Sequence, residues 1–178
     1  TNGMVREPNN VDLLAQMMRA LSDQQRIGVI KRAPVLAEAN LAYRNVRGTG
    51  FENVTDAWGL GEIGVAFGAA TGDFDNDGDL DLVYLSYDGG VSILRNDIAG
   101  RHRVQVRLQG TRSNRHGVGA VVRIQSSTTG LQSQTLTVAR GYAAGSELVA
   151  HFGLGDDETV ERLIVEWPSG VKQIFTDL

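Results

Sequence analysis

The sequence has no cysteine, only 3 prolines and no long hydrophobic run. Without cysteine there can be no disulfide framework, zinc–thiolate site or thiol nucleophile. The cellular compartment stays open, because many exported bacterial proteins need no disulfides. No segment approaches the roughly 18 consecutive apolar residues of a membrane span. No signal-peptide pattern opens the chain. From its start at Thr1-Asn2-Gly3 and its stop at Asp177-Leu178, we expect it to be the C-terminal part of a larger protein, with any export signal outside it.

A large charge of either sign is also lacking. Lys and Arg number 17 against 21 Asp and Glu, and the resulting net charge of −4 gives no general reason to expect a nucleic-acid partner. The chain does contain 22 glycines and 42% hydrophobic residues. This composition suits many tight turns between strands around a core. We therefore expect a mainly β protein with one medium domain or two small ones.

Residues 1–39 are predicted to contain a short α-helical hairpin. Candidate N-caps Asn9 and Asn10 precede apolar residues at helical spacing, namely Val11, Leu14, Ala15, Met18 and Leu21. Ser22 and Gln25 have the spacing of a capping box, which predicts a second short helix that ends before Pro34. We expect the hairpin to have a structural role.

Two β segments follow the hairpin. In residues 40–98, short strands are predicted at 51–55, 65–69 and 80–85, and residues 41–45 echo residues 92–96 at an offset of 51 (96 − 45). In residues 99–178, strands are predicted at 101–108, 119–125, 131–138 and 147–152, with a hairpin of 160–167 and 171–175 across Pro168-Ser169-Gly170. This second segment should form an antiparallel β-sandwich or barrel.

An acidic loop carries the strongest functional signal. Residues 73–81, which we call the Asp loop, contain five aspartates, with glycine at the sixth position. Calcium takes six to eight oxygen ligands at flexible distances, and glycine at that position permits a sharp backbone turn. The predicted calcium site comprises Asp73, Asp75, Asp77, Asp79 through its backbone carbonyl, and Asp81.

Two other interpretations of the Asp loop are weaker. An EF-hand requires a bidentate Glu at position 12 and a helix on each side. Position 12 is Tyr84, and residues 80–85 have a strand pattern. A merely solvated acidic turn requires neither Gly78 at the pivot nor Leu80 between the acids.

A family resemblance joins these features. The Asp loop, leading directly into a strand, resembles the FG-GAP or VCBS repeat of integrin-α-type β-propellers, and residues 41–45, 51–55 and 65–68 resemble the flanking blade motifs. Downstream, the chain resembles the ASPIC/UnbV domain that follows such repeats in cartilage-acidic-protein-like proteins, at residues 108–110, 113–115, 117–120, 141–142, 151–155 and 167–170. The resemblance implies calcium-stabilised propeller blades and an appended β-domain. Because such a propeller has about seven blades, the remaining blades would belong to the parent protein.

The arginines are unevenly distributed. Residues 98–146 contain seven arginines and no acid, whereas residues 147–178 contain seven acids. Arg101, Arg103 and Arg107, which we call the Arg row, occupy alternate-face positions of one predicted strand. They could bind a polyanion such as an acidic glycan. We favour the alternative that acids of residues 156–166 compensate their charge through cross-strand ion pairs.

The predicted function follows from the Asp loop and the resemblance. We expect a non-catalytic, calcium-binding module with a structural, adhesive or protein-interaction role, on the cell surface, outside the cell or in the periplasm. Its expected partners are a protein or an extracellular-matrix glycan, with no nucleic acid and no membrane span. One alternative is a polyanion-binding module centred on the Arg row. Another is an accessory domain of a larger enzyme.

Overall fold

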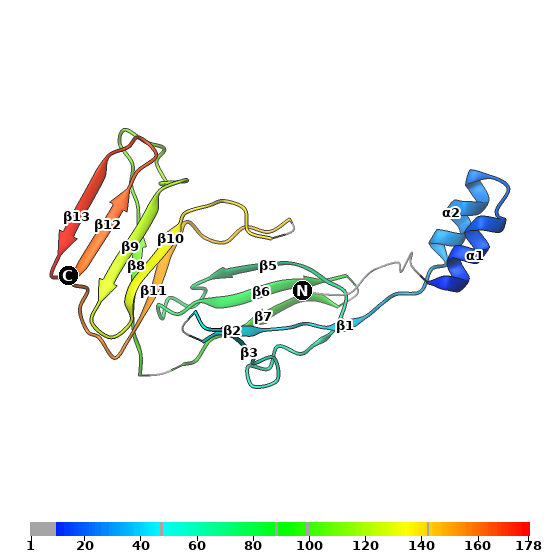
Figure 1. Cartoon of the computed structure of the whole chain (residues 1–178), viewed down its shortest axis with the longest axis horizontal. Helices are drawn as coiled ribbons and strands as arrows, with labels where there is room; N and C mark the ends of the chain where they lie inside the picture. The colour runs from blue at the N-terminus through cyan, green and yellow to red at the C-terminus, as the bar shows by residue number, and fades with distance from the viewer. Residues whose placement is uncertain (1–9, 47, 88, 99, 142) are drawn as a thin grey trace. The chain divides into compact units, whose positions relative to one another are not determined.

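The computed structural model describes residues 10–46, 48–87, 89–98, 100–141 and 143–178, so Asn9 and Tyr142 lie outside the described residues. Figure 1 shows the helices and strands of the chain, which divides into two compact units. The first comprises the chain up to Gly68 together with Tyr84–Ser92, and the second comprises Ala69–Val83 and Ile93–Leu178. The predicted segment boundaries at residues 40 and 99 stay predictions.

The predicted helical hairpin is confirmed. Helix α1 spans Val11–Arg19 and α2 spans Asp23–Lys31. Asn10 caps α1 by accepting the Asp12 and Leu13 N–H groups, at 3.1 and 3.2 Å, and the expected capping box opens α2. Leu13 of α1, Val29 of α2 and Ala33, which follows α2, form a small buried cluster. Among the described residues, no helix is long and apolar enough to cross a membrane.

Two small pairs of strands also belong to the first unit. Strand β2, Tyr43–Asn45, pairs antiparallel with β3, Phe51–Asn53, close to the predicted positions. Strand β1, Glu38–Ala39, pairs with β4, Ile63–Gly64. Sequence patterning did not indicate this second pair, because two residues are too few to show an alternation.

A three-stranded sheet contains the strands on both sides of the Asp loop. Its order is β5-β6-β7, with β5 at Ala66–Gly72, β6 at Asp81–Ser86 and β7 at Gly90–Leu94. Strands were predicted near β5 and β6, whereas β7 overlaps the segment 92–96 that was noted only as an echo of residues 41–45. The predicted strand at 80–85 begins one residue later than expected, so that Asp81 is both the last residue of the Asp loop and the first of β6.

The second unit contains the six strands predicted after residue 99. Strands β8, His102–Arg107, and β11, Val149–Gly155, form an antiparallel pair. The other four form a sheet in the order β10-β9-β12-β13, with β9 at Val121–Ser126, β10 at Gly130–Thr135, β12 at Arg162–Glu166 and β13 at Lys172–Thr176. Strands β12 and β13 pair as the predicted hairpin.

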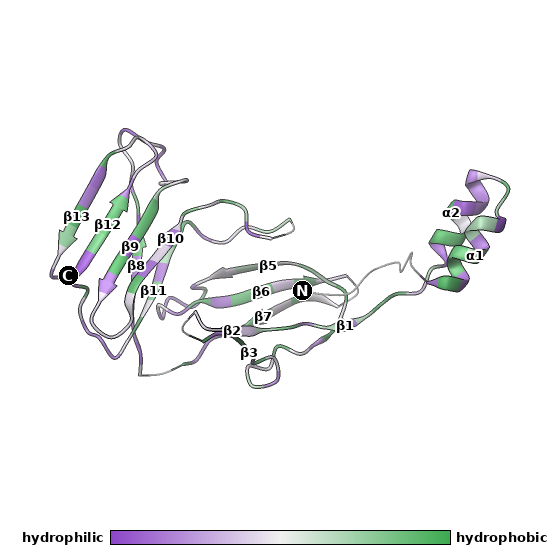
Figure 2. Ribbon diagram, viewed as in Figure 1, coloured by the Kyte–Doolittle hydropathy of each residue, from purple (hydrophilic) through white to green (hydrophobic). Residues whose placement is uncertain are grey.

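One hydrophobic core lies between these two sheets. Alternate residues of β9 point into it, with Val122 fully buried and Ile124 1% exposed. Strand β11 supplies Ala150, Phe152 and Leu154 from the other sheet. Figure 2 shows hydrophobic stretches interrupted by hydrophilic residues along these strands. Both described sheets are open, so the arrangement is a two-sheet packing and the predicted barrel alternative does not apply.

The Glu166 carboxylate should make the stability of this core sensitive to acid. Arg123 forms an ion pair with this carboxylate, and Nζ of Lys172 lies 2.6 Å from its Oε1. The bond from Arg123, followed by that from Lys172, lowers the pKa of Glu166 from 4.5 to about 2. Because the folded pKa is depressed, the stabilisation is complete above pH 4.5 and is lost as the pH falls toward about 2. We expect Glu166→Gln to have a lower free energy of unfolding than the wild type at pH 7, measured by urea denaturation. This difference between the two chains should vanish as the pH falls from 4.5 to about 2. The exposed Glu158→Gln control should show no such convergence, and a difference that persists at pH 2 would contradict the assignment.

Candidate calcium site

The Asp loop connects β5 to β6 through a tight turn. Asn76 and Gly78 have positive φ angles of 61° and 93°, a region that glycine and asparagine tolerate best. At Gly78 a Cβ atom would also lie 2.7 Å from Nε of Arg103. The position therefore favours glycine for its backbone conformation, which agrees with the pivot expected there, and a larger side chain would also displace Arg103.

The turn brings three of the five aspartates together. Ligand oxygens of Asp73, Asp75 and Asp81 all lie within 4.8 Å of one another. Asp81 is 2% exposed, and its two carboxylate oxygens accept the N–H groups of Phe74 and Asn96, each at 2.9 Å. Asp81 thus fixes the start of the loop against Asn96, two residues after the end of β7.

The two carboxylate oxygens of Asp73 differ in their hydrogen bonding to the described residues. Its Oδ2 accepts the Gly78 N–H at 3.0 Å and the Gln105 amide at 2.7 Å. Burial alone would raise the pKa of Asp73, but hydrogen bonds led by that of Gln105 lower it, so the group is anionic. Its buried Oδ1 has no hydrogen-bond partner of normal geometry among the described residues, although the backbone N–H groups of Asn76 and Asp77 also help to lower the pKa of Asp73. A buried anionic oxygen without a donor fits a site that receives a cation.

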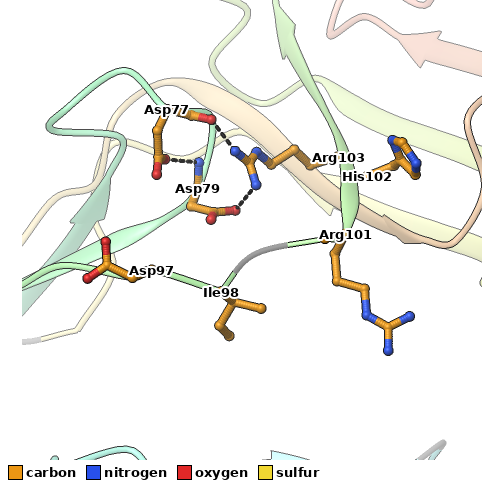
Figure 3. A pocket seen from close by; sticks show the side chains of 8 residues that line it. Asp77, Asp79, Asp97, Ile98, Arg101, His102 and Arg103 are labelled. Atoms are coloured by element: carbon orange, nitrogen blue, oxygen red, sulfur yellow. Dashed lines mark hydrogen bonds and ion pairs between the residues drawn. The ribbon is translucent and has the colours of Figure 1, made fainter.

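The other two aspartates lie outside this cluster. Oδ1 of Asp77 accepts the Asp79 N–H at 2.8 Å. The Asp79 carboxylate forms an ion pair with Arg103 at 2.8 Å, and Arg103 also donates to the backbone carbonyl of Asp77 (Figure 3). Burial, and then repulsion by neighbouring aspartates, raises the pKa of Asp79 against the opposing effect of Arg103. The side chain of Asp79 therefore faces Arg103, which leaves its backbone carbonyl as the predicted calcium ligand.

Three residues far away in the sequence support the loop. Gln105 and Arg103 reach it from β8, and Glu147 accepts the Asp73 N–H at 3.1 Å. The same Oε1 atom of Glu147 lies 2.7 Å from Nε2 of His151. Sequence analysis missed these supporting roles, because no local pattern reveals a contact made across 74 residues.

The Arg row is already compensated by acids. Arg101 pairs with Asp156 at 2.5 Å, Arg103 with Asp79 at 2.8 Å, and Arg107 lies 3.9 Å from Glu147. We expected the Arg row to pair with acids of residues 156–166. This is confirmed for Arg101 and wrong for Arg103 and Arg107. Arg103 turns to the Asp loop, which lies beside β8 in the same compact unit. In Figure 3, Arg101 projects away from Asp77 and Asp79, whereas Arg103 points toward them.

This pairing leads to a prediction for a variant with all three arginines of the Arg row replaced by glutamine. We expect no loss of heparin retention at fixed calcium, because each arginine of the Arg row already lies beside an acid. Stability should fall by a few tenths to about 1 kcal/mol per pair, the usual range for exposed ion pairs. Heparin retention by the unmodified chain that disappears in the variant, with an unaltered melt, would restore the polyanion interpretation.

Comparison with protein families supports one part of the predicted resemblance. Residues 110–178 match the family model of ASPIC and UnbV. They contain β9 to β13 and most of the core residues described above. The match confirms the resemblance for this ASPIC/UnbV region.

The chain is also similar to three proteins named Cartilage acidic protein 1. The protein from Xenopus tropicalis is 34% identical over 113 residues, or 61% of this chain and 17% of that protein. The human protein is 30% identical over 142 residues, or 75% of this chain and 21% of that protein. The mouse protein has the same identity over the same length, and 22% of it is covered. The chain spans about a fifth of the length of the curated relatives it matches.

Proposed function

We propose that the chain is a non-catalytic module in which the Asp loop binds one calcium ion and thereby stabilises the fold. The observation that carries this proposal is the convergence of ligand oxygens of Asp73, Asp75 and Asp81 within 4.8 Å of one another, with Oδ1 of Asp73 buried and without a hydrogen-bond partner in the part of the chain that the structure describes. Without a counter-ion, carboxylates this close would repel one another strongly. A bound cation would relieve that repulsion and satisfy the unpartnered oxygen.

The donor set favours calcium over other metals. All the candidate ligands are oxygen atoms, which suit hard cations, whereas zinc sites are typically built from Cys and His. Calcium tolerates irregular geometry and many carboxylates, whereas magnesium demands a near-ideal octahedron and keeps several waters. Asp73, Asp75 and Asp81 would hold the ion, and the side chain of Asp77 and the backbone carbonyl of Asp79 would complete its coordination.

The sheet around the Asp loop is proposed to be an FG-GAP/VCBS-like blade unit. The loop leads directly into β6, as in that repeat, and residues 41–45 and 92–96 echo each other. Apolar side chains on this sheet remain exposed, with Leu85 at 49%, Val91 at 63% and Ile93 at 68%. Neighbouring blades from the parent protein would cover such surface, in keeping with a propeller that needs about seven blades.

The setting proposed for this module is extracellular, on the cell surface or in the periplasm. The matched relatives are named cartilage acidic proteins, and that name supports an extracellular role in binding a protein or a matrix glycan. The proposed work of the module is structural and adhesive. Calcium would hold the Asp loop rigid and so fix the surface around it.

Calorimetric titration tests the proposal. We expect calcium to bind the chelator-treated chain at one site, and magnesium at the same concentration to bind much more weakly. A chain in which Asp73 is replaced by asparagine serves as the matched control, because it keeps the size of the side chain and removes its charge. The absence of calcium heat from the wild type, or equal heats for wild type and Asp73→Asn, would contradict the proposal.

A further inference from the structure

We propose a second binding site, for an acidic sugar unit, in the ASPIC/UnbV region. It is a cavity of about 120 Å³ between the loop at residues 109–113 and the turn that joins β12 to β13. Both sides belong to the second compact unit. The site shares no residue with the Asp loop, so it stands independently of the proposed calcium function.

The loop on one side of the cavity is held in a fixed conformation. The Gly110 N–H donates to the Arg115 carbonyl at 2.9 Å. The Asn114 side chain donates to the Val118 carbonyl at 2.8 Å and accepts the Val118 N–H at 2.7 Å. A Cβ atom at Gly110 would lie 2.3 Å from the Asn114 carbonyl oxygen, so the chain can pack this closely only with glycine. A ligand therefore meets a loop that is already ordered, which lowers the entropic cost of binding.

The hairpin turn on the other side is equally constrained. The Trp167 N–H donates to the Val171 carbonyl at 2.8 Å, and the Gly170 N–H donates to the Trp167 carbonyl at 2.9 Å. The indole Nε1 of Trp167 donates to Oε1 of Gln173 at 2.7 Å. This bond uses the acceptor of the Gln173 amide and leaves its NH₂ group available as a donor.

Two lining residues, Ser113 and Arg112, have side-chain groups that form no hydrogen bond or ion pair, respectively, with another described residue. The Ser113 hydroxyl is buried and has no hydrogen-bond partner among the described residues. Leaving such a group unpaired costs free energy, so it needs an explanation. Arg112 also lines the cavity, and no ion pair joins it to any described residue, in contrast to the Arg row. The described residues that line the cavity include no acid.

The lining selects the chemistry of the ligand. An uncompensated guanidinium matches a carboxylate, while the Ser113 hydroxyl and the amides of Gln109 and Gln173 can bond the hydroxyls of a sugar ring. The Trp167 indole adds a rigid surface that is apolar with a polar edge. Drug-sized ligands usually occupy largely apolar pockets of roughly 300–1,000 Å³. This smaller polar cavity suits one charged sugar unit at the end or along the side of a glycan.

The two tryptophans of the chain provide a direct readout with an internal control. The indole N–H of Trp167 lies at the proposed site, whereas Trp58 belongs to the first compact unit. In ¹⁵N–¹H spectra of the full chain with calcium, we expect glucuronate to shift the Trp167 indole signal saturably and leave that of Trp58 in place. Glucose, which lacks the charge, and acetate, which lacks the ring, should bind at least about tenfold more weakly.

Three variants sharpen the test. Arg112→Gln should weaken glucuronate binding at least about tenfold, and Arg115→Gln, an exposed arginine outside the lining, should leave it unchanged. Ser113→Ala should also weaken binding, yet it should not lower the melting temperature, because the hydroxyl it removes is unpaired. Three results would overturn the proposal. The Trp167 signal could stay in place in about 50 mM glucuronate, acetate or glucose could bind as tightly as glucuronate, or Arg112→Gln could bind glucuronate as tightly as the wild type.

Discussion

Replacing Asp75 with alanine is expected to abolish calcium binding, whereas replacing Asp79 should leave the affinity within a few-fold of the wild type. The ligand oxygen of Asp75 lies within 4.8 Å of those of Asp73 and Asp81. The carboxylate of Asp79 instead faces Arg103 at 2.8 Å, and position 7 of such a loop contributes its backbone carbonyl, which alanine retains. Calorimetric calcium titration of the two variants measures the difference.

Asp77→Ala provides a third arm of the same experiment. The sequence pattern assigns Asp77 an inward ligand role, and we expect its removal to abolish binding as well. In the structure its carboxylate accepts the Asp79 N–H at 2.8 Å, so the variant also removes a bond that shapes the loop. Equal losses of affinity at Asp75 and Asp79 would show that the register assigned to the loop is wrong.

Replacing Ile124 with alanine should destabilise the second unit by about 2–5 kcal/mol, the usual cost of removing a large aliphatic side chain from a packed core. Ile124 is 1% exposed, and it belongs to the core shared by β9 and β11. The lost apolar contacts and the remaining cavity both contribute to the cost. Urea denaturation in saturating calcium measures it without interference from the Asp loop.

Leu131→Ala is the matched control for Ile124→Ala. Leu131 lies on the neighbouring strand β10 but is 67% exposed. Surface substitutions of this kind usually change stability by less than about 0.5 kcal/mol. Similar losses for the two variants would mean that the faces of β9 and β10 are assigned incorrectly.

Local patterns allowed most of the elements to be predicted. The alternation of polar and apolar residues along 101–108 identified β8 and the inward positions of Val106 and Leu108, because side chains alternate across a strand, but His102, expected to face inward, is exposed. Ser22 and Gln25 marked the start of α2, since a capping box depends on residues three positions apart. Gly78 was recognised as the pivot of the Asp loop from its position alone, and its φ angle of 93° agrees.

Features that depend on distant residues could not be predicted. The pairing of Arg103 with Asp79 and the bond from Asp73 to Glu147 depend on how β8 and the start of β11 lie beside the Asp loop. The expected partners of the Arg row were wrong for Arg107 for the same reason, since Glu147 precedes the predicted acidic hairpin. The cavity at Ser113 and Trp167 likewise forms from two segments that share no sequence pattern.

Thermal melting with and without calcium tests the central claim most directly. If calcium binds only the folded chain, a concentration of 100 times the dissociation constant should stabilise it by about 2.7 kcal/mol. For a chain of this size, that stabilisation corresponds to a rise in the melting temperature of roughly 5–11 °C. We expect this rise between chelator and calcium in the wild type, and no rise in Asp75→Ala. An identical melting temperature for the wild type in chelator and in millimolar calcium would contradict the assignment of the Asp loop as a calcium site.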